Sequence, residues 1–188
     1  MTAISLATVY WLAALAAVGL SIRIAREKSM VARELFWLAL SVGEWALCYG
    51  LETLSATEPM RLLWSQLAYI GTYGTGTFLF RFALRWLRPQ FAGWWINLVW
   101  LVPLFVVLAA FTNEWHGLVW SSIEPSEQYW FVWRYEHGLV FWIGIIYQYL
   151  MIVTSIVLMI IAASVRRGIY RQQAVLVVAG VSIAVAGN

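Results

Sequence analysis

Long apolar stretches alternate with short polar connections along the whole chain. Five of these stretches reach the length of about 20 helical residues that crosses a ~30 Å hydrocarbon core: Ala3–Ile22, Val31–Leu54, Leu62–Leu87, Ala92–Phe111 and Leu139–Val165. A sixth begins near Gln173 and meets Asn188 before it is long enough to cross. The pattern predicts an all-α polytopic membrane helix bundle, with five complete transmembrane helices and a truncated sixth.

Composition supports this prediction and excludes a soluble domain. Hydrophobic residues make up 63% of the chain and charged residues 11%, against roughly 45–50% and 25% in soluble proteins. The 13 Trp residues are typical of membrane interfaces. We therefore expect a single transmembrane domain over residues 1–188, located in the cell membrane with the lipid bilayer as its surroundings. The net charge of +3 gives no reason to expect nucleic acid as a partner.

The positions of the cations predict the orientation. Cytoplasmic connections retain Lys and Arg during insertion, and ten of the 12 cations fall in or beside the first, third and fifth connections: Arg23, Arg26, Lys28, Arg33, Arg81, Arg85, Arg88, Arg166, Arg167 and Arg171. Only Arg61 and Arg134 oppose them. No basic residue precedes the first stretch, so it does not resemble a cleavable signal peptide. We expect the N-terminus to lie outside.

The connection Thr112–Gly138 is rich in Trp and Tyr and is predicted to lie outside. The favoured interpretation is an aromatic belt with a short interfacial or re-entrant stretch; the alternative is a lid over an outward-facing pocket. His116 and His137, near Glu114 and Glu136, have a spacing that matches no zinc-ligand pattern. They are interpreted as structural, and no metal or cofactor is expected.

Glu44 lies near the middle of the second stretch. A charged side chain at that depth costs roughly 2.5–3.5 kcal/mol on insertion scales. It should therefore face the bundle interior, take a proton, or find a donor such as Gln66, Tyr73, Tyr147 or Gln148.

Polar side chains of the third and fifth stretches repeat at helical spacing: Ser65, Tyr69 and Thr72; Gln66 and Tyr73; Tyr147 and Thr154; Gln148 and Ser155. If these helices are neighbours, the stripes face one interior. They indicate either a polar cavity or interhelical hydrogen bonds worth about 0.6 kcal/mol each. Gly71, Gly74 and Gly76 favour close helix packing, and the single cysteine, Cys48, is interpreted as a packing residue.

No catalytic motif is present: the sequence contains no HExxH, GxSxG, P-loop or glycine-rich dinucleotide turn. Lys28 is the only lysine and lies in a predicted connection, so none of the five helices offers a Schiff-base lysine for retinal. The chain is therefore not expected to be an enzyme. A small proton-coupled or solute transporter remains an alternative because of Glu44, although no inverted repeat is visible.

Four blocks of the sequence occur in a recognisable order: WALCYGLETLS, LLWSQLAYIG, LVPLFVVLAAFTNEWHGLVWSSI and YRQQAVLVVAGVSIAVAGN. In content and spacing the chain resembles the seven-transmembrane region at the N-terminus of sensor histidine kinases. It departs from that family in the third helix, where TYGTGTFLF carries glycines in place of the usual prolines, and in Glu44.

The resemblance implies a signal-input domain that senses an unknown small-molecule or membrane stimulus and signals, commonly as a homodimer, to cytoplasmic kinase and PAS modules. A seventh helix and those modules are expected beyond Asn188, so this region should have no phosphotransfer activity. The candidate sensing residues combine the family's recognisable blocks with the polar interior: Glu44, Trp45, Tyr49, Glu52, Gln66, Tyr69, Tyr147 and Gln148. Trp45, Tyr49 and Glu52 share one helix face, where packing is favoured over a pocket.

Overall fold

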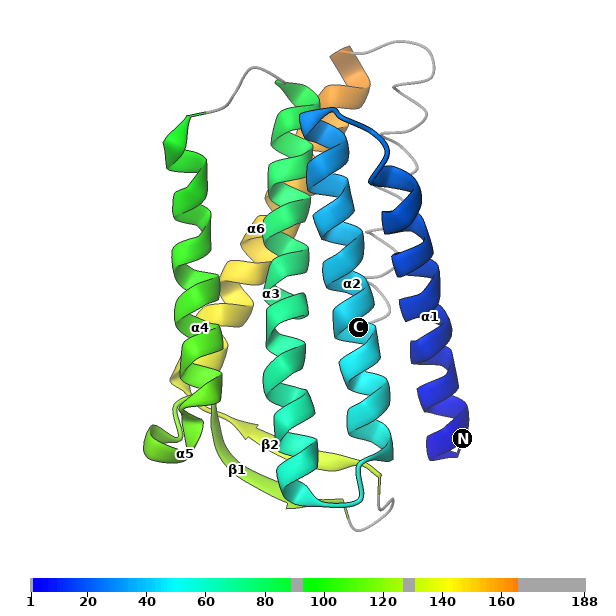
Figure 1. The fold of residues 1–188 in the computed structure, drawn as a ribbon. Coiled ribbons are helices and arrows are strands. Elements are labelled where there is room, and N and C mark those ends of the chain that lie inside the picture. The colour runs from blue at the N-terminus through cyan, green and yellow to red at the C-terminus, as the bar shows by residue number, and fades with distance from the viewer. Residues whose placement is uncertain (1, 89–92, 127–130, 166–188) are drawn as a thin grey trace.

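The computed structural model describes residues 2–88, 93–126 and 131–165. Each of the five predicted apolar stretches is helical: α1 spans Ala3–Ile24, α2 Met30–Leu54, α3 Glu58–Leu87, η1 Trp94–Trp100 continues into α4 Leu101–Phe111, and α6 spans Leu139–Val165. The long helices run alongside one another as a bundle (Figure 1). The predicted sixth stretch and the three arginines after position 165 lie outside the described residues.

Three of these helical segments are long and apolar enough to cross a membrane, namely α1, Trp94–Phe111 and α6. They support a multi-pass membrane protein. Helices α2 and α3 are long as well, but they carry charged side chains, several of them buried in the bundle. Their crossing of the bilayer, and with it the number of five complete spans, stays a prediction.

Local signals set the helix boundaries. The Ser29 side chain accepts a hydrogen bond from the backbone N–H of Ala32 and so caps the start of α2. Pro59 stands in the first turn of α3, where its missing N–H costs nothing. The Thr2 hydroxyl caps α1 in the same way as Ser29 caps α2.

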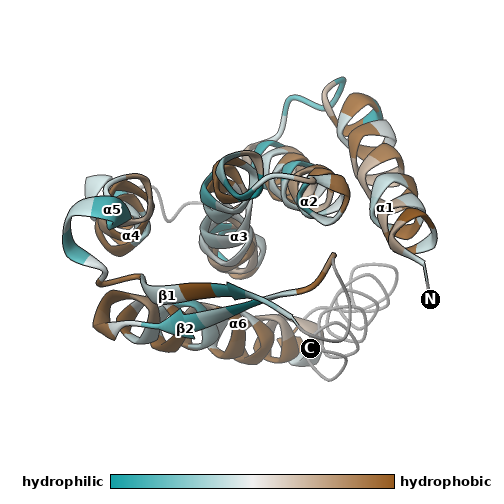
Figure 2. Cartoon of the chain, turned by 90° about the horizontal axis from the view of Figure 1, so that it is seen from below, coloured by the Kyte–Doolittle hydropathy of each residue, from teal (hydrophilic) through white to brown (hydrophobic). Residues whose placement is uncertain are grey.

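Helix α3 occupies the centre of the bundle, with α2 on one side and α4 and α6 on the others (Figure 2). Small residues allow these contacts. A side chain at Gly71 would meet the backbone of α2, and one at Gly76 would meet Gln148 of α6. Tyr73 of α3 packs in turn against Gly144 of α6. Close packing, the predicted role of the glycines in the third helix, is thus confirmed.

The connection after α4 folds differently from the expectation of an all-α chain. A short helix, α5 (Asn113–His116), leads into an antiparallel hairpin of β1 (Trp120–Pro125) and β2 (Trp133–His137), with Ile123 opposite Tyr135. In β2 the aromatic residues alternate with charged ones, which is the period of a strand and not of a helix. The hairpin lies across one end of the bundle, beside the ends of α2 and α3 (Figure 1).

Asn113 holds the entry to this hairpin. Its side-chain oxygen accepts hydrogen bonds from the backbone N–H groups of Val119 and Trp120 at 2.9 and 3.0 Å, and its amide donates to the Trp120 carbonyl at 2.9 Å. Gly117 supplies the left-handed turn between them, with a φ of 61°. One asparagine therefore fixes the direction in which β1 leaves α4 and α5.

Candidate functional site

A single tyrosine joins the hairpin to two helices. The Tyr135 hydroxyl of β2 donates to Glu52 Oε1 of α2 at 2.8 Å and lies 2.9 Å from the Ser65 hydroxyl of α3. Burial, followed by the negative charge of Glu52, raises the pKa of Tyr135 above its ordinary value of 10.0. The hydroxyl therefore keeps its proton and can donate to the carboxylate. Glu52 was a predicted site residue, whereas Tyr135 was not.

Arg61 makes a second connection at the same end. Its guanidinium donates to the carbonyls of Ser55 at 2.7 Å and Phe131 at 2.9 Å, and lies 5.2 Å from the Trp133 ring centroid. Arg61 is 3% exposed. In the sequence it was only one of two cations on the outer side. In the structure Arg61 is buried, and its hydrogen bonds link the turn between α2 and α3 to the hairpin.

The aromatic residues of the Thr112–Gly138 connection have two different roles. Trp115 is 85% exposed, as an interfacial belt requires. Trp120, in contrast, is buried and meets Tyr69 edge-on at 5.2 Å and Tyr135 at 5.7 Å. Trp120 thus anchors the hairpin in the bundle interior, and Tyr69, a predicted site residue, forms part of the surface that receives it.

Trp45, Tyr49 and Glu52 share a helix face but not a common environment. Trp45 packs edge-on against Tyr49 at 5.6 Å, and Tyr49 also contacts Tyr10 of α1 at 5.8 Å. Glu52 is directed to the hairpin instead. Tyr49 therefore belongs to the α1–α2 contact, Trp45 packs on Tyr49 from the same helix, and only Glu52 belongs to the hairpin junction.

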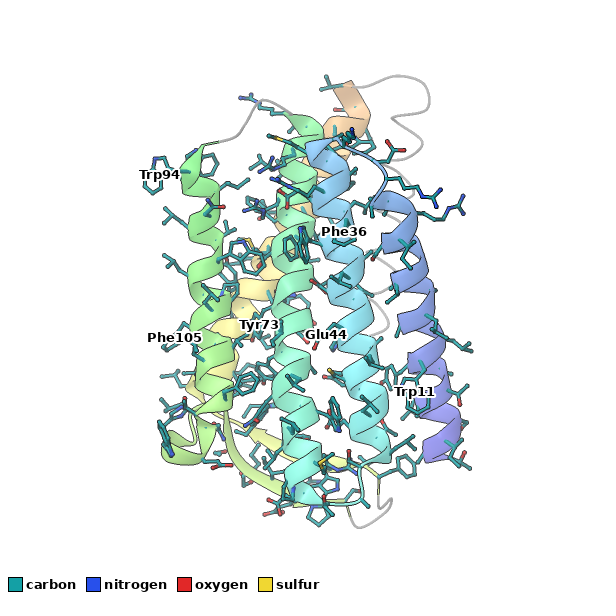
Figure 3. All side chains as sticks on the ribbon, viewed as in Figure 1. Trp11, Phe36, Glu44, Tyr73, Trp94 and Phe105 are labelled. Carbon is teal, nitrogen blue, oxygen red and sulfur yellow. The ribbon has the colours of Figure 1, made fainter. Side chains whose placement is uncertain are left out.

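Glu44 lies in the middle of α2, facing α3 (Figure 3). Cys48 donates its S–H to Glu44 Oε1 at 3.1 Å, and Oε2 lies against the backbone at Gly71. The donor is thus none of the four side chains predicted. Cys48 lies one helical turn from Glu44 on the same helix, so its thiol reaches the carboxylate without a side chain from a neighbouring helix. Cys48, interpreted as a packing residue, is also a hydrogen-bond donor.

Three of the four predicted donors bond backbone carbonyls of neighbouring helices, and the fourth, Tyr73, packs against Gly144 of α6. Gln66 of α3 donates to Ala110 in α4 at 3.2 Å, Tyr147 of α6 donates to Val99 in η1, and Gln148 of α6 donates to Thr72 in α3 at 2.6 Å. Thr154, predicted to face the interior with Tyr147, is exposed, because one face of α6 points away from the bundle. These bonds fit interhelical attachment better than an open polar cavity.

A buried ion cluster occupies the opposite end of the bundle. Glu34 of α2, 1% exposed, forms salt bridges of 2.9 Å with both Arg81 and Arg85 of α3. Its two oxygens accept from Arg81 in a bidentate arrangement, and Arg81 also donates to Asn97 of η1 at 2.9 Å. Both arginines were predicted within the third stretch, beside the connection that follows it. The structure places them in α3 and shows that they are buried and paired with Glu34.

The two histidines of the Thr112–Gly138 connection have local partners. His116 uses both ring nitrogens locally, since Nε2 lies 3.1 Å from the Thr112 hydroxyl and Nδ1 accepts from the Leu118 N–H at 3.0 Å. The His137 ring stacks on Phe141 at 3.6 Å. Within the described residues, no three His, Cys, Asp or Glu side chains gather as a metal would require.

Comparison with known families decides the broader assignment. A family model described as the N-terminal 7TM region of histidine kinase matches residues 7–188. The chain belongs to this family. No curated protein and no solved structure gives a significant match. The histidine kinase 7TM region is a sensor region and not the catalytic module, which agrees with the multi-pass helices found here.

The four sequence blocks that carried the resemblance all lie within the matched range of the 7TM region. The first three blocks supply Glu52, Ser65 and Trp120 in turn. Glu52 and Ser65 lie within hydrogen-bond distance of the Tyr135 hydroxyl, and Trp120 packs against the Tyr135 ring. The missing prolines of the third helix leave α3 continuous from Glu58 to Leu87. Helix α3 can therefore connect the hairpin junction to the ion cluster as one element.

Proposed function

We propose that this chain is the membrane-embedded signal-input domain of a histidine kinase, and that the hairpin junction is where a stimulus acts on the bundle. The observation that carries the proposal is the position of Tyr135, whose hydroxyl contacts Glu52 of α2 and Ser65 of α3 together. An external stimulus that moves β2 must strain or break this junction. The consequence is a shift in the balance between two arrangements of α2 and α3.

The far ends of the same two helices are fixed to each other by Glu34, Arg81 and Arg85. Helices α2 and α3 are thus joined by polar contacts at both ends, with close backbone packing at Gly71 between them. Such a pair moves more readily as a unit than by bending, because each joint resists separation. We infer that displacement of the hairpin reaches the opposite end as movement of this pair.

In this proposal the N-terminus and the hairpin lie outside, and the ion cluster lies toward the cytoplasm. Residues 1–188 act as one sensor domain, paired with a second copy and followed in the full-length protein by kinase and PAS modules. The stimulus is a small molecule or a change in the membrane. The candidate sensing residues then divide by position: Glu52 and Tyr69 serve the hairpin junction, Glu44, Trp45 and Tyr49 the contacts of α2, and Gln66, Tyr147 and Gln148 the attachment of α4 and α6.

The transporter alternative receives no support from the contacts described. The polar side chains that would line a pathway donate to backbone carbonyls of neighbouring helices. Glu44, the proposed proton carrier, faces Gly71 and Cys48.

The Tyr135→Phe variant tests the proposal. It removes one hydroxyl and leaves the aromatic ring, so the ring stays packed against Trp120 while the hydroxyl contacts with Glu52 and Ser65 are lost. Neutral hydrogen bonds contribute about 0.5–1.5 kcal/mol, and bonds to charged groups about 1.5–3 kcal/mol. We expect basal autophosphorylation of the full-length kinase in native membranes to change by about fivefold or more, which corresponds to ~1 kcal/mol.

Tyr149→Phe is the matched control, because Tyr149 is 40% exposed on α6 and makes no hydrogen bond to another described residue. It should leave autophosphorylation unchanged. If the two variants behave alike while both are expressed and folded, the hairpin junction has no part in signalling.

Glu44→Gln tests the residue in the middle of α2. Gln keeps the shape of Glu and can still accept the Cys48 hydrogen bond, so insertion and folding should be preserved. Removal of the ionisable group should abolish any dependence of kinase output on external pH that passes through this site. Autophosphorylation measured between pH 5 and 8 in variant and parent checks this; identical profiles would remove Glu44 from sensing.

A further inference from the structure

A cavity lies where α1 ends and α2 begins, at the end of the bundle opposite the hairpin. Its volume is about 490 Å³, and its lining includes Lys28, Met30, Arg33, Phe36 and Trp37. Figure 3 shows Phe36 on α2 toward this end. The cavity is separate from the hairpin junction and plays no part in the function proposed above.

The polar side of this cavity has an excess of positive charge. Lys28 and Arg33 face a single acidic neighbour of the lining, Glu27. Neither Lys28 nor Arg33 forms a salt bridge with another residue that the structure describes. Both cations are exposed and so available to an anion from outside the chain.

The buried ion cluster adds to this excess. It contains two guanidinium groups, Arg81 and Arg85, for the single carboxylate of Glu34. Arg85 also donates to the sulfur of Met30 at 2.9 Å, and Met30 lines the cavity. The ion cluster therefore contacts the cavity wall and carries a net positive charge. Because the cluster is buried, water screens this charge less than it would screen an exposed one.

The remaining side of the cavity is apolar and aromatic. Trp37 is 43% exposed and Met30 50% exposed, and both line the cavity together with Ile24, the last residue of α1. Trp is the residue typical of headgroup depth in a membrane. The cavity thus offers cations to an anionic headgroup, and aromatic and apolar helix surface to the tails. A ligand with an anionic head and apolar tails fits this arrangement.

We propose that this cavity is a binding site for the headgroup of an anionic phospholipid, with its phosphate held by Lys28 and Arg33 and its acyl chains lying along α1 and α2. Basic pockets between transmembrane helices are suited to such headgroups because each cation near the surface favours anionic lipid. The site would tie the α1–α2 connection to the composition of the surrounding leaflet.

Native mass spectrometry of the purified full chain tests the proposal, with equal amounts of phosphatidylglycerol and phosphatidylcholine of identical acyl chains. We expect phosphatidylglycerol to remain bound preferentially. The double variant Lys28→Gln and Arg33→Gln should lose this bound lipid by about tenfold or more, since it removes two cations of the site. The matched control, Arg23→Gln with Arg26→Gln, removes the same charge close by but outside the cavity lining and should retain the lipid.

Four results would overturn the proposal. Equal losses of bound phosphatidylglycerol in the two double variants would mean that binding reflects general electrostatic attraction and not this cavity. Equal binding of phosphatidylcholine would show that the site does not select for negative charge. Displacement of the lipid by excess inorganic phosphate would make free phosphate the ligand. A change in the fraction of dimer without lipid binding would make this face a contact between copies.

Lys28→Arg with Arg33→Lys keeps both charges and should keep the lipid, which separates loss of the site from loss of folding.

Discussion

Glu34→Gln is expected to lower the free energy of unfolding by about 3–5 kcal/mol, because it leaves two buried guanidinium groups without their carboxylate. Glu34 is 1% exposed and bridges Arg81 and Arg85 across the α2–α3 contact. The amide of Gln keeps the shape but not the charge. Unfolding of the purified chain in mixed micelles, followed by circular dichroism as a function of denaturing detergent, gives the measurement.

Glu27→Gln is the control for this experiment. Glu27 lies only seven positions earlier, in the exposed connection between α1 and α2, and its replacement should change the unfolding free energy by less than about 0.5 kcal/mol. Equal and small effects of both substitutions would mean that the ion cluster does not hold α2 to α3. The joint proposed for the far end of this helix pair would then be lost.

Gly71→Ala is expected to destabilise the bundle by about 1–3 kcal/mol through overpacking. A Cβ atom at this position would come within 2.5 Å of the Ser41 carbonyl oxygen and 2.7 Å of the Trp45 backbone nitrogen. Both atoms belong to the backbone of α2, so no side-chain rotation relieves the clash and the helices must separate. The same detergent titration measures the effect.

Gly19→Ala provides the comparison, because a Cβ atom at Gly19 would meet nothing within 4 Å. Alanine is the better helix former by about 1 kcal/mol, so this variant should be neutral or more stable. A stable Gly71→Ala variant would show that α2 and α3 are not packed as closely as described. In the full-length kinase, a forced separation at Gly71 should also alter the basal output.

Periodicity and length in the sequence were sufficient to place the helices. The predicted stretch Leu139–Val165 coincides with α6, and Val31–Leu54 differs from α2 by one residue. This succeeds because a run of apolar residues of spanning length has few alternatives to a helix when its backbone must be satisfied away from water. The start of α3 was placed four residues late, since Glu58 and Pro59 look like a connection but form its first turn.

The polar contacts could not be predicted in the same way. A hydropathy profile places Arg81 and Arg85 in the last turns of an apolar stretch, beside a cation-rich connection, and gives no sign that Glu34 lies opposite them. That placement depends on how far two antiparallel helices are offset, which the pattern leaves free. One signal was nevertheless available: in consecutive antiparallel helices, the start of the second stretch lies near the end of the third, so an acid there can pair with a cation here.

The hairpin was missed for a different reason. Its strands are short, and Trp120 and Tyr135 were read as members of an interfacial belt because Trp and Tyr are common there. The alternation of charged and aromatic residues from Trp133 to His137 was the signal for a strand. The family resemblance pointed to Glu52, but its partner Tyr135 lies 83 positions away along the chain.

Arg61 and Arg81 lie on the same continuous helix, at positions 61 and 81, which at ~1.5 Å per residue places them about 30 Å apart. This equals the thickness of the hydrocarbon core of a typical bilayer. The predicted crossing of α3 would thus place one guanidinium at each boundary of the membrane, with Arg61 bound to the hairpin and Arg81 bound to Glu34 and Asn97. A thicker or thinner bilayer would have to tilt α3 or displace one of these contacts, so acyl-chain length is a variable that can act on both ends at once.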